Sequence, residues 1–255
     1  MAQLLLELFS EEIPARMQRR AADDLKKLIG DALTEASLPT EAIAAYTTPR
    51  RLTVLVEGLP ESQPDISEEK RGPRTDAPEK AIQGFLKANG VTLEDCEKRT
   101  AGKGEFWFAV IERKGQPTRD LLSDILPDVI RKLPWQKSMR WGEGAFRWVR
   151  PLQRVMCVLD GKTVPLEIAD GIPDGNITSG HRFLAPEPFE VGFFDDYEKT
   201  LQLNKVVLKA SMRRDLIVQR AKELTAAQNL ELKHDAALLN EVAGLVEWPV
   251  VLMGS

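Results

Sequence analysis

The order of strand-like and helix-like patterns is the feature of this sequence that most constrains its fold. Strand-like patterns with helices between them extend to about residue 194, and only helix-like patterns rich in Ala, Leu and charge follow, to residue 247. Runs of strands followed by runs of helices are typical of α+β proteins. We therefore predict an α+β (mixed) fold, with an antiparallel or mixed sheet and packed helices in residues 1–194 and a helical segment in residues 195–255.

The first elements illustrate the reasoning. The apolar run Leu4–Phe9 predicts a buried strand. Ser10 to Pro14 is typical of a helix start, with Ser10 as the cap and Glu11 and Glu12 as acids of the first turn. Apolar residues then recur at helical spacing, which predicts a helix to about residue 36.

The same patterns predict the remaining elements. In chain order they are strands at 43–46 and 52–56, an exposed loop at 60–79 that contains several prolines, a helix at 81–88, a strand at 105–113, a helix at 118–133, a hairpin of 155–159 and 164–168 joined by Asp160-Gly161, and helices at 195–203, 209–229 and 235–247. After Glu247 an apolar strand is predicted. A domain seldom ends on such a strand, so we expect residues 1–255 to be the truncated part of a longer chain.

Composition excludes several classes of protein. Hydrophobic residues make up 43% and charged residues 29% of the chain, as in an ordinary globular protein with a core. No apolar run is long enough to cross a bilayer, so no membrane contact is expected. Cys96 and Cys157 lie far apart, which argues against a disulfide framework and a cysteine zinc site and favours the reducing cytoplasm.

Motifs that suggest catalysis do not hold up, and we expect no catalytic residue, metal or cofactor in this chain. Gly161-Lys162-Thr163 lacks the first glycine of a phosphate loop, because Met156 stands there. His234-Asp235 lacks further histidines for a metal site, and Asp235 is better explained as an acid at the start of a helix. Cys157, within an apolar run, is most simply a core residue.

Residues 131–154 contain the most distinctive local pattern. Seven basic residues and one acidic residue, Glu143, alternate with aromatic residues in a chain whose net charge is −4. Arginine suits phosphates and aromatic rings offer stacking surfaces, a combination common in RNA-binding proteins. In the alternative interpretation, the tryptophans belong to the core and the arginines surround them as solvated charge.

Arginines beside Gly, Pro or an aromatic residue recur in predicted turns, where binding residues are often presented. These turns contain Arg50 and Arg51, Arg71, Arg140, Arg150 and Arg182. Each alone is explained by a surface ion pair, and together they make a common anionic partner more plausible.

In their order and spacing, these segments resemble the beta subunit of bacterial glycyl-tRNA synthetase over essentially the whole chain. The segments are Leu6–Pro14, Pro49–Leu52, Lys70–Pro73, Met139–Gly142, Val149–Pro151, Gly180–Phe183 and Glu241–Leu252. The resemblance implies a subunit of an α2β2 heterotetramer that joins glycine to its tRNA with ATP and Mg²⁺, with the active site in the alpha subunit. It also implies that residues 1–194 are similar to the editing-type domain of the phenylalanyl-tRNA synthetase beta chain.

On this basis we expect a noncatalytic part of the enzyme that binds tRNA through its phosphates. The expected contacts are Lys137, Arg140, Trp141, Arg147, Arg150 and Arg154, with Arg50, Arg51, Arg71 and Arg182 beside them. Two alternatives remain. The arginine turns could instead hold the alpha subunit, because Arg and Trp are also enriched at protein interfaces. A hydrolytic editing role is less favoured, because the sequence offers no obvious hydrolytic residues.

Overall fold

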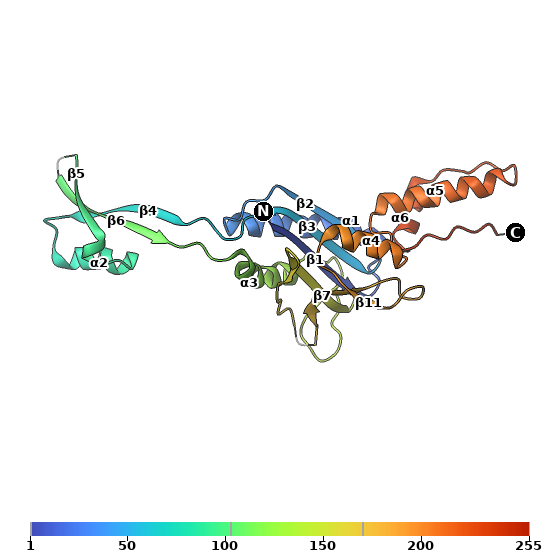
Figure 1. Ribbon diagram of the computed structural model, residues 1–255, viewed down its shortest axis with the longest axis horizontal. Helices are drawn as coiled ribbons and strands as arrows, with labels where there is room; N and C mark the ends of the chain where they lie inside the picture. Colours follow the sequence, from blue (N-terminus) through green and yellow to red (C-terminus); the bar gives the residue numbers. More distant parts are fainter. Residues whose placement is uncertain (1, 103, 170, 255) are drawn as a thin grey trace. The chain divides into compact units, whose positions relative to one another are not determined.

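The computed structural model in Figure 1 describes residues 2–102, 104–169 and 171–254. It confirms the α+β class and divides the chain into two compact units: unit 1, Met1–Glu61 with Thr118–Ser255, and unit 2, Ser62–Pro117. The predicted change from sheet to helices near residue 194 falls inside unit 1. No helix of the described residues is long and apolar enough to cross a bilayer.

The central sheet of unit 1 has the strand order β2-β3-β1-β7-β8, with β9 also paired to β7. Its strands are β1 (Ala2–Ser10), β2 (Ala42–Thr47), β3 (Arg51–Leu59), β7 (Leu152–Leu159), β8 (Lys162–Thr163) and β9 (Asp174–Gly175). Neighbours are antiparallel except β7 and β9. β1 lies in the middle, where Leu6 pairs with Val54 on one side and with Cys157 on the other.

Both faces of this sheet are covered, which explains the nearly continuous apolar sequence of β1. Because side chains alternate along a strand, Leu4, Leu6 and Leu8 pack on one face with helices α1 (Ala15–Glu35) and α3 (Thr118–Arg131). Leu5 packs on the other face with helix α4 (Phe194–Leu203), around Tyr197. The predicted buried strand is thus confirmed.

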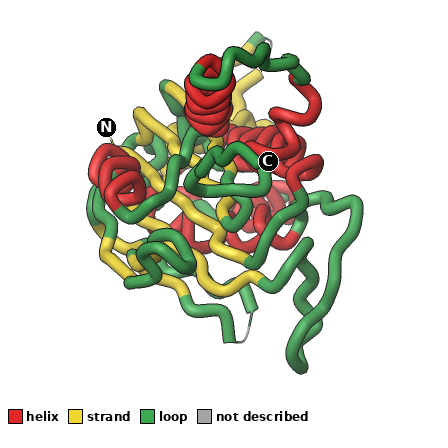
Figure 2. Tube along the Cα trace, turned by 90° about the vertical axis from the view of Figure 1, so that its right-hand side faces the viewer, coloured by secondary structure: helices red, strands yellow, loops and turns green. Residues whose placement is uncertain are grey.

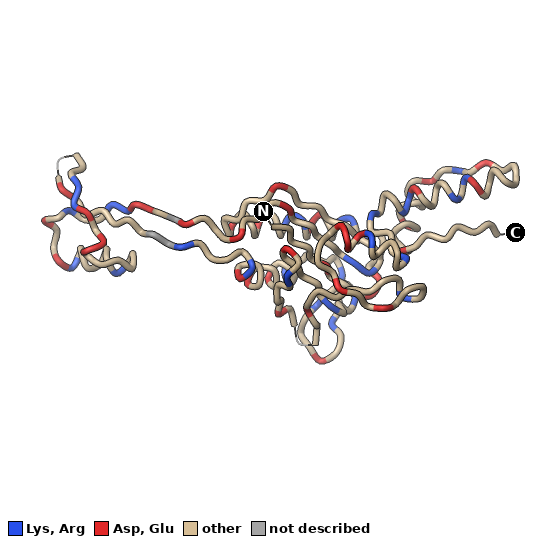
Figure 3. The backbone as a smooth tube through the Cα atoms, in the orientation of Figure 1, with Lys and Arg blue, Asp and Glu red and all other residues tan. Residues whose placement is uncertain are grey.

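Smaller elements surround this core. Strands β10 (Ile177–Ser179) and β11 (Pro188–Glu190) pair with each other. Helices α5 (Ala210–Ala226) and α6 (Ala236–Ala243) follow α4, so the helices predicted at 209–229 and 235–247 are present, but the second ends at Ala243. Figure 3 shows basic and acidic residues mixed along α5. Arg213 is the one buried residue among the described residues of α5.

Unit 2 contains a sheet in the order β4-β6-β5 with helix α2 against it. The elements are β4 (Ile66–Arg74), α2 (Glu79–Asn89), the short 3-10 helix η1 (Leu93–Asp95), β5 (Cys96–Ala101) and β6 (Gly104–Arg113). The predicted α2 and β6 are confirmed, as is the helix end at Gly90, whose φ is 65°. The prediction of a loop at 60–79 was wrong, because residues 66–74 pair antiparallel with β6.

Three details of unit 1 also differ from the predictions. Helix α1 begins after Pro14 and has no acid in its first turn, so Ser10 is not its cap and Glu11 and Glu12 precede it. The hairpin turn is confirmed, with positive φ at Asp160 (46°) and Gly161 (74°), but its second strand is only β8. Among the described residues after Glu247, no strand forms.

Candidate nucleic-acid interface

The segment between α3 and β7 is mostly loop (all loops and turns are green in Figure 2), and aromatic side chains hold it to the core. Trp148 is 1% exposed, and Trp135 meets it edge-on with 5.0 Å between ring centroids. Phe146 stacks on Trp148 at 5.8 Å, and Trp141 meets Phe146 edge-on at 5.7 Å. Backbone hydrogen bonds of 2.8 and 3.1 Å between Met139 and Trp148 close the loop. The interpretation of these aromatics as packing residues holds for Trp148, while Trp141 is half-buried.

Four predicted contacts lie on the outside of this loop: Lys137, Arg140, Arg147 and Arg150 are all exposed. Arg147 donates to the hydroxyl and carbonyl oxygens of Ser138 at 3.1 and 3.0 Å, and Arg150 donates to the Val149 carbonyl at 2.9 Å. In the part of the chain that the structure describes, none of the four forms an ion pair with a carboxylate. We call them the loop cations. Their charges remain available to an anionic ligand.

Arg154 and Arg50 gather around Phe9 on the sheet. Their guanidinium carbons lie 5.1 and 4.5 Å from the centroid of the Phe9 ring. Arg50 is 8% exposed and donates to the Ser10 carbonyl at 3.3 Å and the Gln153 amide oxygen at 3.1 Å. Burial lowers the pKa of Arg50, against the charge of Glu11. Arg50 therefore supports the sheet, and Arg154 is half-buried beside it.

Arg51 lies in the interior, with no exposed surface. Its Nε donates to Glu7 Oε2 at 3.1 Å, its Nη1 donates to Glu247 Oε1, and its Nη2 donates to the Ser179 carbonyl. A guanidinium that is fully enclosed by such partners has no surface to offer a phosphate. We therefore remove Arg51 from the predicted tRNA contacts and assign it to the interior.

Hydroxyl groups complete this buried network. Tyr197 donates to Glu7 at 2.6 Å, and Thr48 donates to Glu247 at 2.6 Å. Burial alone would lower the pKa of Arg51, but the charges of Glu247 and Glu7 raise it. Burial alone would raise the pKa of Glu247. The charge of Arg51 and the hydrogen bond from the Thr48 hydroxyl outweigh burial, so the pKa of Glu247 is lowered. The pKa of Tyr197 is raised by burial and by the charge of Glu7. The network joins β1, β3, α4 and the residues after α6.

Two further predicted contacts are engaged elsewhere. Arg182 forms ion pairs with Glu12 and, at 3.6 Å, with Glu11. Arg71 belongs to unit 2, where its guanidinium carbon lies 3.7 Å from the centroid of the Phe106 ring and its side chain stays exposed.

Sequence reasoning missed Glu7, Tyr197, Arg213 and Glu247, which the structure buries. The sequence did contain a sign that Glu7 is buried, because it is the one charged residue within the apolar run Leu4–Phe9. A charged side chain in a strand that is buried on both faces needs a partner of opposite charge. The structure offers no metal site in the part of the chain that it describes: these residues contain no cluster of three or more His, Cys, Asp or Glu residues that could hold a metal ion.

Comparison with known proteins identifies a family. The sequence profile of the family described as glycyl-tRNA synthetase beta subunit matches residues 4–255. Over 259 aligned residues the chain is 51% identical to the glycine–tRNA ligase beta subunit of Paracoccus denitrificans, and 52% and 51% identical to those of Ruegeria sp. and Cereibacter sphaeroides. All of this chain is covered, and it spans 38%, 38% and 37% of the three relatives, respectively.

Proposed function

Since the chain belongs to the glycyl-tRNA synthetase beta subunit family, we propose that it is a noncatalytic, tRNA-binding and structural part of a glycine–tRNA ligase. In this proposal an alpha subunit attaches glycine to its tRNA with ATP and Mg²⁺, and the two kinds of subunit form a cytoplasmic α2β2 heterotetramer. This chain would contribute by holding the tRNA in place. Such positioning lowers the entropic part of the barrier without any bond chemistry of its own.

The loop cations are the single observation that carries this proposal. They are exposed, have no carboxylate partner among the described residues, and sit on a loop fixed by Trp148. A rigid base matters because side chains that are already positioned lose less entropy when a ligand binds. Arg140, Arg147 and Arg150 are proposed to contact phosphate or sugar, with Lys137 adding positive potential. Trp141, half-buried at the edge of the aromatic cluster, could still stack on an unpaired base.

The test is a titration of the protein with glycine tRNA across a salt series. Each phosphate contact contributes roughly 0.7 to 0.9 to the slope of log K against log salt. The double variant Arg140→Ala/Arg150→Ala is expected to weaken binding and to reduce the slope by about 1.4 to 1.8. The matched control is Lys26→Ala/Lys222→Ala, which removes two exposed charges from α1 and α5 and should change the slope far less. Equal effects of the two double variants would reject the proposal.

A second function is supported by the apolar surface near the end of the chain. Leu203, Val250 and Leu252 are 78%, 68% and 83% exposed, and Met212 and Leu216 on α5 are also exposed. Met212 and Leu216 line one pocket with Val207 and Trp248, and exposed apolar patches often mark protein interfaces. The alternative is therefore a module for alpha–beta assembly without RNA contact. It predicts that Leu216→Asp weakens copurification with the alpha subunit, that Arg140→Ala does so too where the arginine turns hold that subunit, and that neither variant changes tRNA binding.

A further inference from the structure

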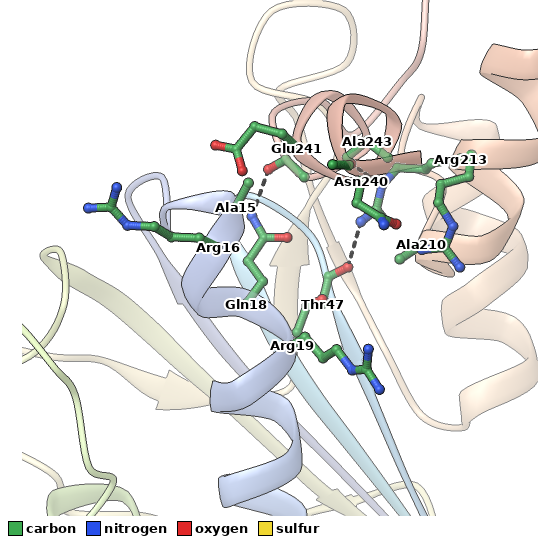
Figure 4. Close-up of a pocket in the computed structure, with 13 residues that line it drawn as sticks. Ala15, Arg16, Gln18, Arg19, Thr47, Ala210, Arg213, Asn240, Glu241 and Ala243 are labelled. Carbon is green, nitrogen blue, oxygen red and sulfur yellow. Dashed lines mark hydrogen bonds between the residues drawn. The ribbon is translucent and has the colours of Figure 1, made fainter. Parts of the chain in front are cut away.

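A pocket of about 580 Å³ opens between the beginnings of α1 and α5 and the face of α6, all within unit 1 (Figure 4). Its walls are tied together by short contacts. Gln18 of α1 is buried and donates to the Gly244 carbonyl at 2.6 Å. A Cβ on Gly244 would lie 2.5 Å from the Cβ of Ala15, so α6 ends directly against the start of α1.

Arginines dominate the lining of this pocket. Arg16 and Arg19 come from α1, Arg213 and Arg214 come from α5, and Glu241 is the one carboxylate among the described lining residues. Arg16 and Arg214 form no ion pair within the described residues, and Arg19 has only a 4.0 Å contact to Asp23, which is exposed. The lining thus has a clear excess of positive charge, in a chain whose net charge is −4.

Arg213 gives the pocket a buried positive charge. It is 0% exposed, and it donates to four carbonyl oxygens, those of Ala243, Val207, Leu208 and Thr47, at 2.7 to 2.9 Å. These partners are neutral, and none of the described carboxylates forms an ion pair with it. Burial lowers the pKa of Arg213 to about 10, although the charge of Glu247 acts in the opposite direction. A buried cation without a direct counter-charge is stabilised by an anion nearby.

We propose that this pocket binds a phosphate group. Guanidinium groups pair with phosphate through parallel hydrogen bonds, and several of them around one anion are more selective than a single surface charge. Arg214 would contact the phosphate, and Arg16, whose side chain points outward in Figure 4, would turn inward to join it. Arg19 would close over the phosphate, and Arg213 would act from beneath through its charge. The backbone N–H groups at the starts of α1 and α5 add to this field, because neither helix has a side-chain cap or an acid in its first turn.

The phosphate could come from RNA or from a small molecule. Arg16 also lines a second, smaller pocket together with Arg20, Pro134 and Gln136, so positive side chains of α1 adjoin the segment that carries the loop cations. This adjacency favours an RNA phosphate. That part of the inference rests on the proposed function, whereas phosphate binding itself does not.

The experiment uses Arg16→Gln/Arg214→Gln, with Lys26→Gln/Lys222→Gln as a control that removes the same charge from the same two helices. Arg213 is left intact, because its loss would disturb the fold. Calorimetry with inorganic phosphate and with ATP should show saturable binding that the pocket variant weakens roughly tenfold to a hundredfold and the control does not. Thermal melts of both variants check that they fold.

A tRNA titration of the same proteins separates the two sources. Loss of tRNA affinity in the pocket variant, beyond that of the control, supports an RNA phosphate, and loss of phosphate or ATP binding alone supports a small ligand. If neither ligand responds to the pocket variant, or if an acidic peptide binds there instead, the inference is wrong. The variants at Arg140 and Arg150 test the loop cations separately, so the two proposals can fail independently.

Discussion

Arg51→Met offers the sharpest test of the buried network. The substitution keeps an unbranched side chain but removes the charge that faces Glu7 at 3.1 Å and also pairs with Glu247. Both carboxylates remain buried, at 0% and 5% exposure, and the Ser179 carbonyl loses its donor. Removing one partner of a buried ion pair typically costs about 3–5 kcal/mol. Because two carboxylates are left here, we expect a loss at the upper end of that range.

The assay is urea unfolding followed by tryptophan emission, which reports mainly on unit 1, since Trp107 is the one tryptophan in unit 2. Arg19→Met is the control, because Arg19 is 96% exposed and its contact to Asp23 is 4.0 Å. Exposed pairs of this kind contribute about 0.5 kcal/mol or less. A loss below about 1 kcal/mol for Arg51→Met would refute the assignment of Arg51 to a buried ion-pair network.

The pH dependence of this loss has a definite sign. The folded protein holds the pKa of Glu247 below its usual value, so this group stabilises the fold above the unfolded pKa of about 4.3 and loses that contribution as pH falls through the lower folded pKa. In Arg51→Met the main cause of the lowered pKa is gone. The difference in unfolding free energy between variant and parent should therefore be full near pH 7, and it should shrink as pH falls through the folded pKa of Glu247 in the variant, which burial raises, and then through the lower folded pKa in the parent. A difference that stays constant with pH would contradict this account.

Three other predictions test the packing. Trp148→Ala should cost about 3–5 kcal/mol and speed amide exchange in residues 137–150, because the ring anchors that loop; unchanged exchange would contradict the anchoring role. Gly180→Ala should cost about 1–3 kcal/mol in thermal melts, since its Cβ would lie 2.4 Å from the Ala185 carbonyl oxygen. The control Gly144→Ala, which has open space around it, should leave the stability nearly unchanged. Burial raises the pKa of Cys157, so its thiol should resist iodoacetamide at pH 8 until the protein unfolds, and rapid labelling of the native protein would argue against its burial.

Elements with strong apolar periodicity could be predicted from the sequence, and charged strands could not. β1, β3 and β7 are buried, and their apolar residues mark them. β4 and β5 are the outer strands of the β4-β6-β5 sheet, and most of their described side chains are exposed. Outer strands tolerate charge and proline. Pro73 falls where the pairing of β4 with β6 shifts between Arg71 and Arg74, so the residue that suggested a loop sits at an irregularity of a strand.

The candidate site was predictable only in part, because the partners of its arginines are distant in the sequence. The sequence identified which turns carry arginine, but it could not identify which arginines have acidic partners. Arg51 meets Glu7 and Glu247, which are 44 and 196 residues away in the chain, and Arg182 meets Glu12 across 170 residues. Only the fold brings such groups together.

Two similar local patterns therefore have opposite outcomes in this chain. Arg51, two residues after Pro49, is the first residue of β3, and Arg150, beside Pro151, lies two residues before β7. Yet Arg51 is enclosed by carboxylates, and Arg150 remains exposed without one among the described residues. A buried arginine must be neutralised in place because desolvation of its charge is costly, whereas an exposed one keeps its hydration until a ligand arrives. Substitutions at the two kinds of site should therefore affect different properties, folding stability in one case and ligand binding in the other. Variants of Arg51 should lower stability at any salt concentration, and variants of the loop cations should lower only binding, by an amount that fades as salt rises.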